Sequence, residues 1–216
     1  MFLELVEGPL WYFSAFVFVV GVIWRLIDVF RRGTRVDLAP SRVSSGAAAL
    51  GGLKTVLTRS WTAPGFTRGA TFHLINGYLF HLGLFILLFF AAPHVVFIEE
   101  RILGFGWTPA PHWLFILAAN LAFAGLILLW LRRVMHPVMR RISTFDDHAG
   151  AILTFIAMFT GCMALLQGHD SLRAIHMLTV EILMIYFPFS RLMHAFTFAF
   201  SRNYTGAAMA RKGVQA

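Results

Sequence analysis

Five long apolar runs dominate this 216-residue sequence and fix what it can fold into. They cover roughly residues 10–30, 72–97, 113–134, 149–167 and 172–200. About 20 apolar residues cross a bilayer as a helix, because the hydrocarbon core is about 30 Å thick and each residue adds about 1.5 Å. Only 13% of the residues are charged, whereas a soluble domain carries roughly 25%. The sequence therefore predicts an all-α fold, a single membrane domain over 1–216 made of five transmembrane helices.

The basic residues separate the two sides of the membrane. Arginines and lysines gather in segment 31–70, in the loop between the third and fourth runs, and in the tail 201–216, whereas the other two loops carry only Arg101 and Arg173. By the positive-inside rule, segment 31–70, the tail and the C-terminus are expected in the cytoplasm and the N-terminus outside. The net charge of +8 thus reports topology. Nucleic-acid binding is not expected, because the cations flank spans and form no separate basic domain.

The cysteine content excludes disulfides and cofactors held by several cysteines. The single cysteine, Cys162, lies inside an apolar run. One thiol cannot support a disulfide framework, a cysteine-ligated iron–sulfur cluster or a C-x-x-C-H haem attachment. Cofactor chemistry must therefore rest on histidine, of which the chain has nine, with methionine as the alternative. Ionisable residues within membrane spans are costly to bury and usually serve a function.

Four histidines lie at matched depths on two of the runs. His81 and His94 belong to the second run, and His176 and His194 to the fifth. On one helix, the 18 residues from His176 to His194 make five turns and about 27 Å, which puts both rings on one face near opposite membrane surfaces. Because the two runs are antiparallel, His81 can face His194, and His94 can face His176. Imidazole is a standard axial ligand of non-covalently bound haem, so the pattern predicts two haem b groups with these four residues as iron ligands.

The position of His94 is the weak point of this pairing. It follows His81 by 13 residues, which turns its ring by about 220° on a straight helix. Pro93 directly precedes it and could kink or unwind the helix, re-aiming the ring. His73 is the alternate ligand; otherwise it is an interfacial histidine beside the basic loop.

Other groups near the histidines have two readings each. Arg191 is a candidate partner for a haem propionate, or it extends to the cytoplasmic surface. Glu181 is a candidate for proton uptake from a quinol, or it hydrogen-bonds within the bundle. Gly77 and Gly83 flank His81 and suit either the approach of a flat macrocycle or the packing of helices.

Two stretches resemble the respiratory nitrate reductase gamma subunit family. FPFSRLMHAF at 187–196 is similar to the motif of its last helix, and LFHLG at 79–83 to its second helix. The five spans and their orientation agree with that family. The resemblance implies a dihaem membrane cytochrome b that exchanges electrons with quinones. It carries His81 and His194 over as ligands of the haem nearer the cytoplasm, and His176 as a ligand of the outer haem.

One ligand position departs from the family pattern. Nitrate reductase members place the second ligand of this helix ten residues after the first, at the position of Ala91 here, and the nearest histidine is His94. The departure argues against nitrate reductase itself, and relatives of the family serve heterodisulfide-reductase-like and sulfite-reduction-linked complexes. The resemblance implies a cytoplasmic iron–sulfur or molybdenum-containing partner subunit and a place in the lipid of a prokaryotic cytoplasmic (inner) membrane.

The sequence therefore predicts the membrane-anchoring dihaem cytochrome b subunit of a respiratory oxidoreductase complex. It would pass electrons between the membrane quinone pool and a cytoplasmic redox partner, with terminal catalysis on another subunit. The alternative is a transporter or proton-relay protein that uses intramembrane histidines. That alternative predicts polar residues along several spans, whereas the first, third and fourth are almost wholly apolar. A structural anchor without cofactor gives no reason for histidines at matched depths.

Overall fold

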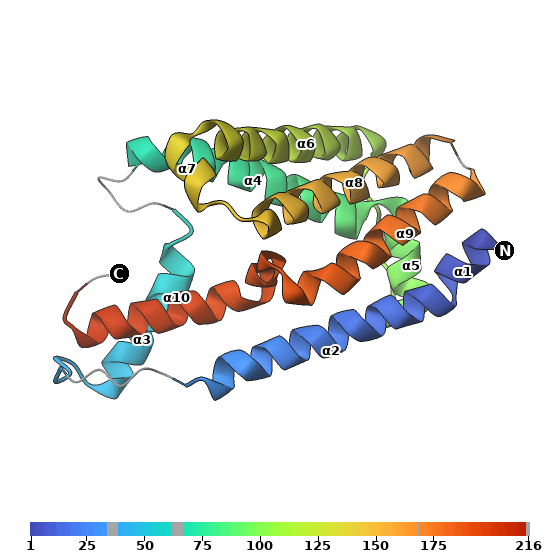
Figure 1. Cartoon of the computed structure of the whole chain (residues 1–216). Coiled ribbons are helices and arrows are strands. Elements are labelled where there is room, and N and C mark those ends of the chain that lie inside the picture. Colours follow the sequence, from blue (N-terminus) through green and yellow to red (C-terminus); the bar gives the residue numbers. More distant parts are fainter. Residues whose placement is uncertain (34–38, 62–66, 168, 215–216) are drawn as a thin grey trace. The chain divides into compact units, whose positions relative to one another are not determined.

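The computed structural model describes residues 1–33, 39–61, 67–167 and 169–214, and over these ranges the chain is helical with no strand (Figure 1). The helices in chain order are α1 (Phe2–Glu7), α2 (Pro9–Arg31), α3 (Ser45–Thr58), α4 (Thr67–Phe90), α5 (Ala92–Ile98), the π-helix η1 (Glu99–Leu103), α6 (His112–Met135), α7 (Pro137–Ile142), α8 (Phe145–Gln167), α9 (Asp170–Tyr186), the 3₁₀ turns η2 (Phe187–Phe189) and η3 (Arg191–Met193), and α10 (His194–Arg211). Five segments are long and apolar enough to cross a membrane: Phe2–Arg31, Gly69–Phe90, His112–Met135, Phe145–Leu165 and Asp170–Phe189. The predicted all-α membrane fold is confirmed at this level.

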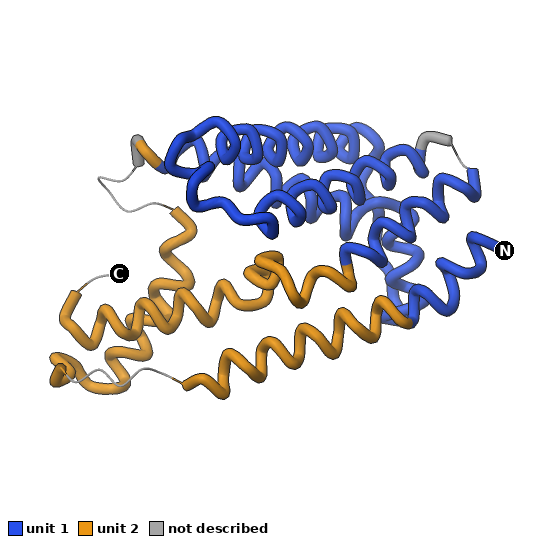
Figure 2. Tube along the Cα trace, in the orientation of Figure 1, with its two compact units in different colours: residues 1–12, 70–183 blue, residues 13–69, 184–216 orange. Residues whose placement is uncertain are grey.

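The chain divides into two compact units (Figure 2). Unit 1 comprises Met1–Tyr12 and Ala70–Leu183, and unit 2 comprises Phe13–Gly69 and Met184–Ala216. Unit 2 therefore joins most of the first span to α3 and α10, which lie far apart in sequence. Each unit is described separately, and the single membrane domain over 1–216 stays a prediction.

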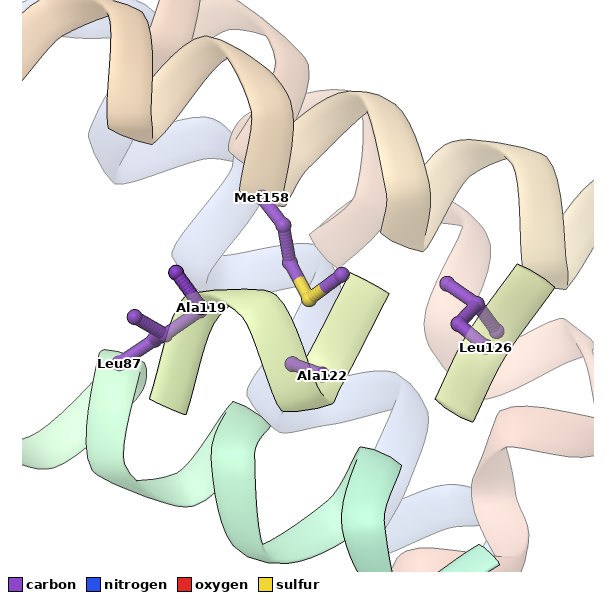
Figure 3. Packing of buried hydrophobic residues seen from close by; sticks show 5 residues of the cluster. All are labelled: Leu87, Ala119, Ala122, Leu126 and Met158. Atoms are coloured by element: carbon purple, nitrogen blue, oxygen red, sulfur yellow. The ribbon is translucent and has the colours of Figure 1, made fainter. Parts of the chain in front are cut away.

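The core of unit 1 lies where α4, α6 and α8 meet. Figure 3 shows its buried side chains, which are Leu87 of α4, Ala119, Ala122 and Leu126 of α6, and Met158 of α8. Phenylalanines pack around them, and the rings of Phe123 and Phe155 meet edge to face with centroids 5.2 Å apart. Small residues on α6 let the larger side chains of α4 and α8 fill the space between the three helices.

Two glycines set the close approach of α4 and α6. A Cβ atom on Gly83 would lie 2.5 Å from the carbonyl oxygen of Ala118, and one on Gly125 would lie 2.7 Å from the carbonyl oxygen of Asn76. The two backbones are therefore in direct contact at both points, as is common where membrane helices pack through small residues. Of the two readings of Gly83, helix packing is the one that the structure bears out. A Cβ atom on Gly77 would meet nothing within 4 Å.

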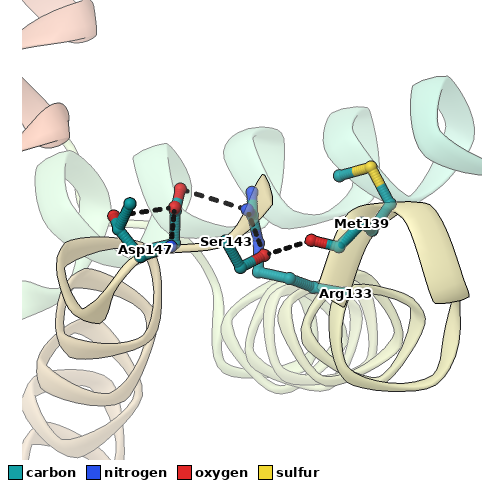
Figure 4. A network of polar contacts seen from close by, with 5 residues as sticks. Arg133, Met139, Ser143 and Asp147 are labelled. Carbon is teal, nitrogen blue, oxygen red and sulfur yellow. Dashed lines mark hydrogen bonds and ion pairs between the residues drawn. The ribbon is translucent and has the colours of Figure 1, made fainter. Parts of the chain in front are cut away.

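A polar network closes the turn between α6 and α8 (Figure 4). The guanidinium of Arg133 pairs with the Asp147 carboxylate at 3.1 Å and donates to the Ser143 hydroxyl at 3.1 Å. The other Asp147 oxygen accepts from the backbone N–H of Thr144, which directly precedes α8, at 2.9 Å. Asp147 thus both caps the N-terminus of α8 and pairs with Arg133. These contacts fix the start of α8 against the end of α6.

The second apolar run breaks near its end, as the proline suggests. Helix α4 ends at Phe90, Ala91 is extended, and Pro93 lies in the first turn of α5. Pro93 has no N–H to donate to the carbonyl of Phe89, and a proline ring clashes with that carbonyl in a continuous helix. In its place the indole N–H of Trp107 donates to the Phe89 carbonyl at 2.7 Å, and the N–H of Ala110 donates to the Phe90 carbonyl at 2.9 Å.

The expectation that residues 172–200 form one helix is wrong. Helix α9 ends at Tyr186, and η2 and η3 separate it from α10. Pro188 removes a helical hydrogen bond, and its buried ring packs on α2, where a Cβ atom on Gly21 would lie 2.6 Å from the proline Cβ. The Ser190 hydroxyl donates to the Phe187 carbonyl at 2.9 Å and accepts from the Leu192 N–H at 3.1 Å. The five-turn argument that put His176 and His194 on one helix face therefore fails.

We expect Gly83→Ala to destabilise the chain and Gly77→Ala to be tolerated. Both changes raise helix propensity equally, but only the methyl at 83 meets the backbone of α6, and such overpacking costs about 1–3 kcal/mol. Thermal unfolding in detergent, followed by circular dichroism, measures the difference. Equal midpoints for the two variants would contradict the close approach of α4 and α6.

Candidate functional site

Two of the four predicted ligands lie side by side in unit 1. The imidazole rings of His94 on α5 and His176 on α9 have centroids 5.9 Å apart and planes inclined by 21°. Both side chains are half-buried. The structure thus brings together residues that are 82 positions apart in sequence, in the pairing that the sequence predicts.

The break before α5 sets the position of the His94 ring. Its Nδ1 atom lies 2.9 Å from the carbonyl oxygen of Leu87 and 3.0 Å from that of Leu88. These carbonyls belong to the last turn of α4, where helical partners run out. A carbonyl oxygen only accepts, so Nδ1 carries the hydrogen and donates it, which leaves the ring's lone pair on Nε2. The unfavourable phase of His94 on a straight helix is therefore corrected by the break itself.

Hydroxyl groups hold the His176 ring. Its Nδ1 lies 3.2 Å from the Oγ1 of Thr160 on α8. The Thr160 hydroxyl lies within hydrogen-bond distance of the Ile156 carbonyl, at 2.9 Å, and of the Thr179 hydroxyl, at 2.9 Å. The Thr179 hydroxyl itself donates to the His176 carbonyl at 2.7 Å. The Thr160 hydroxyl can accept from an Nδ1–H of His176 or donate to Nδ1, and the first arrangement leaves the lone pair on Nε2.

A glycine on α8 gives the His176 ring its space. A Cβ atom on Gly161 would lie 3.0 Å from Cε1 and 3.4 Å from Nε2 of that ring. Sequence reasoning passed over Thr160 and Gly161. The available signal was a hydroxyl followed by a glycine inside the otherwise apolar fourth run.

His81 and His194 show the same local geometry in separate units. The Nδ1 of His81 lies 2.7 Å from the carbonyl oxygen of Gly77, one turn earlier on α4 in unit 1. In unit 2, the Nδ1 of His194 lies 2.8 Å from the carbonyl oxygen of Arg191, in the interruption before α10. Both rings therefore also donate from Nδ1 and carry the lone pair on Nε2. Their mutual pairing stays a prediction.

His136 shows that a hydrogen bond donated by Nδ1 is not common to all histidines of the chain. His136 caps α7, and its Nδ1 accepts from the backbone N–H of Met139 at 3.5 Å. Its hydrogen therefore lies on Nε2 when the ring is neutral, opposite to His81, His94 and His194. His73, the alternate ligand, lies exposed on α4, outside the His94–His176 pair.

Glu181 is the most deeply buried ionisable side chain of unit 1. It lies on α9, 1% exposed, and neither carboxyl oxygen has a hydrogen-bond partner among the residues that the structure describes. A buried polar group without a partner is rare and calls for an explanation. Arg191 is exposed in η3, and its predicted contact with a propionate stays a prediction.

The donor set fits a haem. An iron with an imidazole on each face holds the two ring centroids about 6 Å apart, because metal–nitrogen bonds are about 2.0–2.1 Å long. The His94 and His176 ring centroids have this spacing, at 5.9 Å, which stacked rings without a metal also adopt. Ligating histidines almost always donate their other ring N–H to an oxygen, as His94 does here to the carbonyls of Leu87 and Leu88. Over the described ranges no three His, Cys, Asp or Glu side chains cluster to hold a metal ion alone.

One relative shares nearly the whole length of the chain. A protein of Nitratidesulfovibrio vulgaris is 29% identical over 211 residues, which covers 95% of this chain and 92% of that protein. No family model matches the sequence.

The hydrogen bonds predict which nitrogen of each neutral ring is protonated. We expect His94 to carry the hydrogen on Nδ1 and His136 to carry it on Nε2, and the predicted role of His176 as an iron ligand requires the hydrogen on its Nδ1. Nitrogen-15 NMR of the cofactor-free chain, with each signal assigned by its His→Gln variant, reads the two tautomers directly. An Nε2–H form at His94 would contradict the geometry of its hydrogen bonds, and one at His176 would contradict its predicted role.

Proposed function

We propose that this chain is the membrane-anchoring dihaem cytochrome b subunit of a respiratory oxidoreductase complex in a prokaryotic cytoplasmic membrane. It would exchange electrons between the membrane quinone pool and a cytoplasmic partner with iron–sulfur or molybdenum centres. The resemblance to the nitrate reductase gamma family motivates this proposal. A heterodisulfide-reductase-like partner fits the departure at Ala91 better than nitrate reductase does.

One observation carries the proposal. All four histidines that the sequence selects turn Nδ1 to an oxygen, and the carbonyl partners of His81, His94 and His194 leave the lone pair of those three rings on Nε2. Two of them lie at a separation that suits one iron. The shared tautomer favours metal ligation over a chain of proton-carrying histidines, since a relay needs rings whose two nitrogens exchange roles.

The protein residues would hold and orient the cofactor. His94 and His176 would bind the outer haem, and His81 and His194 the haem nearer the cytoplasm, with His73 as the alternate ligand. When bound, haem supplies one-electron transfer at a potential set by its axial ligands and surroundings. With haem bound, Nδ1 of His176 would donate to the Thr160 hydroxyl, which would fix the plane of the ring and raise the basicity of Nε2.

The distribution of charge supports an orientation with the C-terminus in the cytoplasm. Arg132 and Arg133 end α6, and Arg140 and Arg141 lie on α7, at the same end of the third and fourth spans. Together with the basic tail and segment 31–70, they favour this side as cytoplasmic and as the docking side for an acidic partner subunit.

Glu181 would serve the quinone reaction as a proton acceptor. Oxidation of a quinol releases two protons with its two electrons, and a carboxyl group inside a span can receive one. Its burial within unit 1, without a hydrogen-bond partner in the described chain, supports a role that depends on a bound group.

Haem content tests the ligand assignment. We expect two b-type haems per purified chain by pyridine haemochrome, and about half of that content after His94→Ala, because the outer iron loses one axial ligand. His136→Ala is the matched control and should keep both haems. A well-folded chain without haem would contradict the proposal and would favour the proton-relay alternative.

Kinetics test the role of Glu181. Glu181→Gln keeps the size of the side chain but removes the proton-accepting carboxylate, so we expect haem content to stay unchanged while quinol-driven haem reduction slows by about 10²-fold or more. Stopped-flow absorbance with a soluble quinol measures the rate, and dithionite reduction is the control. An unchanged quinol rate would remove Glu181 from the quinone reaction.

A further inference from the structure

Helix α3 has two faces of opposite character. It is not among the five segments able to cross a membrane, and it lies between the first two of them in the chain. One face is made of small residues that are buried against α10. The other face carries large apolar side chains that nothing covers in the described chain.

The small face fixes α3 on α10 within unit 2. A Cβ atom on Gly51 would lie 2.5 Å from the Cβ of Ala210, and one on Gly206 would lie 2.6 Å from the Cβ of Thr55. The two backbones are thus nearly in contact, and Figure 1 shows α3 running at a steep angle to α10. The direction in which the opposite face of α3 points is therefore fixed relative to α10.

The opposite face is an apolar stripe, which we define as Leu50, Leu53 and Leu57. These side chains are 68%, 53% and 70% exposed. Their spacing of three and then four residues places them on one side of the helix. Trp61, 58% exposed, follows the helix, and tryptophan is enriched at membrane–water interfaces. Three exposed leucines along one side of a 14-residue helix indicate a surface that contacts lipid or another apolar partner.

Contacts within unit 2 place α3 close to the level at which the first span ends. The ring of Phe30, one residue before the end of α2, meets the ring of Phe200 on α10 with centroids 5.0 Å apart. The residues of α10 that face α3 begin three positions later, at Asn203, and Gly206 follows. They lie about 5–9 Å beyond the end of the first span, and the headgroup layer is itself about 5–8 Å thick.

The charge near the stripe suits lipid headgroups. Lys54 is exposed one turn after Leu50, and a hollow of about 190 Å³ between α3 and α10 is lined by Lys54 and Arg59 among others. Residues 39–61 contain three cations and no Asp or Glu. An apolar face flanked by cations is the pattern of a helix that lies in the membrane interface.

We propose that α3 is an interfacial membrane-binding helix of this chain. Leu50, Leu53 and Leu57 enter the acyl-chain boundary of the bilayer that the spans cross, and Lys54 contacts anionic phospholipid headgroups. Because α10 is packed on α3, membrane binding by the stripe holds the end of α10 at the membrane surface.

Nitroxide labels test the depth of the stripe. In a Cys162→Ala background, single cysteines replace Leu50, Leu53, Leu57 or, as a control outside the stripe at the first residue of the same helix, Ser45. The full-length chain is placed in phosphatidylcholine nanodiscs that contain one quarter phosphatidylglycerol. We expect collisions with oxygen to exceed those with a water-soluble nickel chelate severalfold at positions 50, 53 and 57, and the reverse at 45.

Two results would overturn the proposal in separate parts. Water-like accessibility at all three leucine positions would contradict membrane insertion and would leave a protein partner as the occupant of the stripe. Depth that is unchanged both by Lys54→Gln and by omission of phosphatidylglycerol would contradict the headgroup contact. Elution of each variant as a single species from gel filtration confirms that it has folded.

Discussion

A helix that is interrupted must find new partners for the carbonyls of its last turn, and the site depends on how this chain does so. An unpaired carbonyl in the hydrocarbon costs several kcal/mol. Where Pro93 ends α4, the carbonyls of the last turn accept hydrogen bonds from the indole of Trp107, the backbone N–H of Ala110 and the imidazole of His94. His94 is therefore held by the backbone that the proline disrupted. The same bond fixes its tautomer and gives Nε2 the lone pair that an iron needs.

The second interruption follows a similar logic. Pro188 stops α9, Ser190 bridges the two short 3₁₀ turns, and His194 donates from Nδ1 to the Arg191 carbonyl. At both interruptions an imidazole satisfies a backbone oxygen as it begins or enters the next helix. Under the proposed function, the same hydrogen bonds would satisfy the interrupted backbone and prepare the rings to bind metal.

Features that depend on composition could be predicted from the sequence, whereas features that depend on local geometry could not. Five apolar runs were enough to predict the spans, and Pro93 was enough to suggest that His94 is re-aimed toward His176. The prediction of a single helix over 172–200 was wrong because the apolar run continues through Pro188 and Ser190, where the helix is interrupted. His176 and His194 therefore lie on two different helices, and their spacing of 18 residues does not correspond to five helical turns. Thr160 and Gly161 could not be predicted because their role depends on the packing of α8 against α9. The haems, the orientation of the termini and the partner stay predictions.

Low-temperature EPR of the oxidised, purified chain tests the central claim most directly. Imidazole planes inclined by only 21° at His94 and His176 predict a low-spin ferric signal of rhombic form. That signal should disappear in His94→Ala and persist in His136→Ala. A chain that carries haem but shows only highly anisotropic or high-spin signals would contradict axial ligation by this pair.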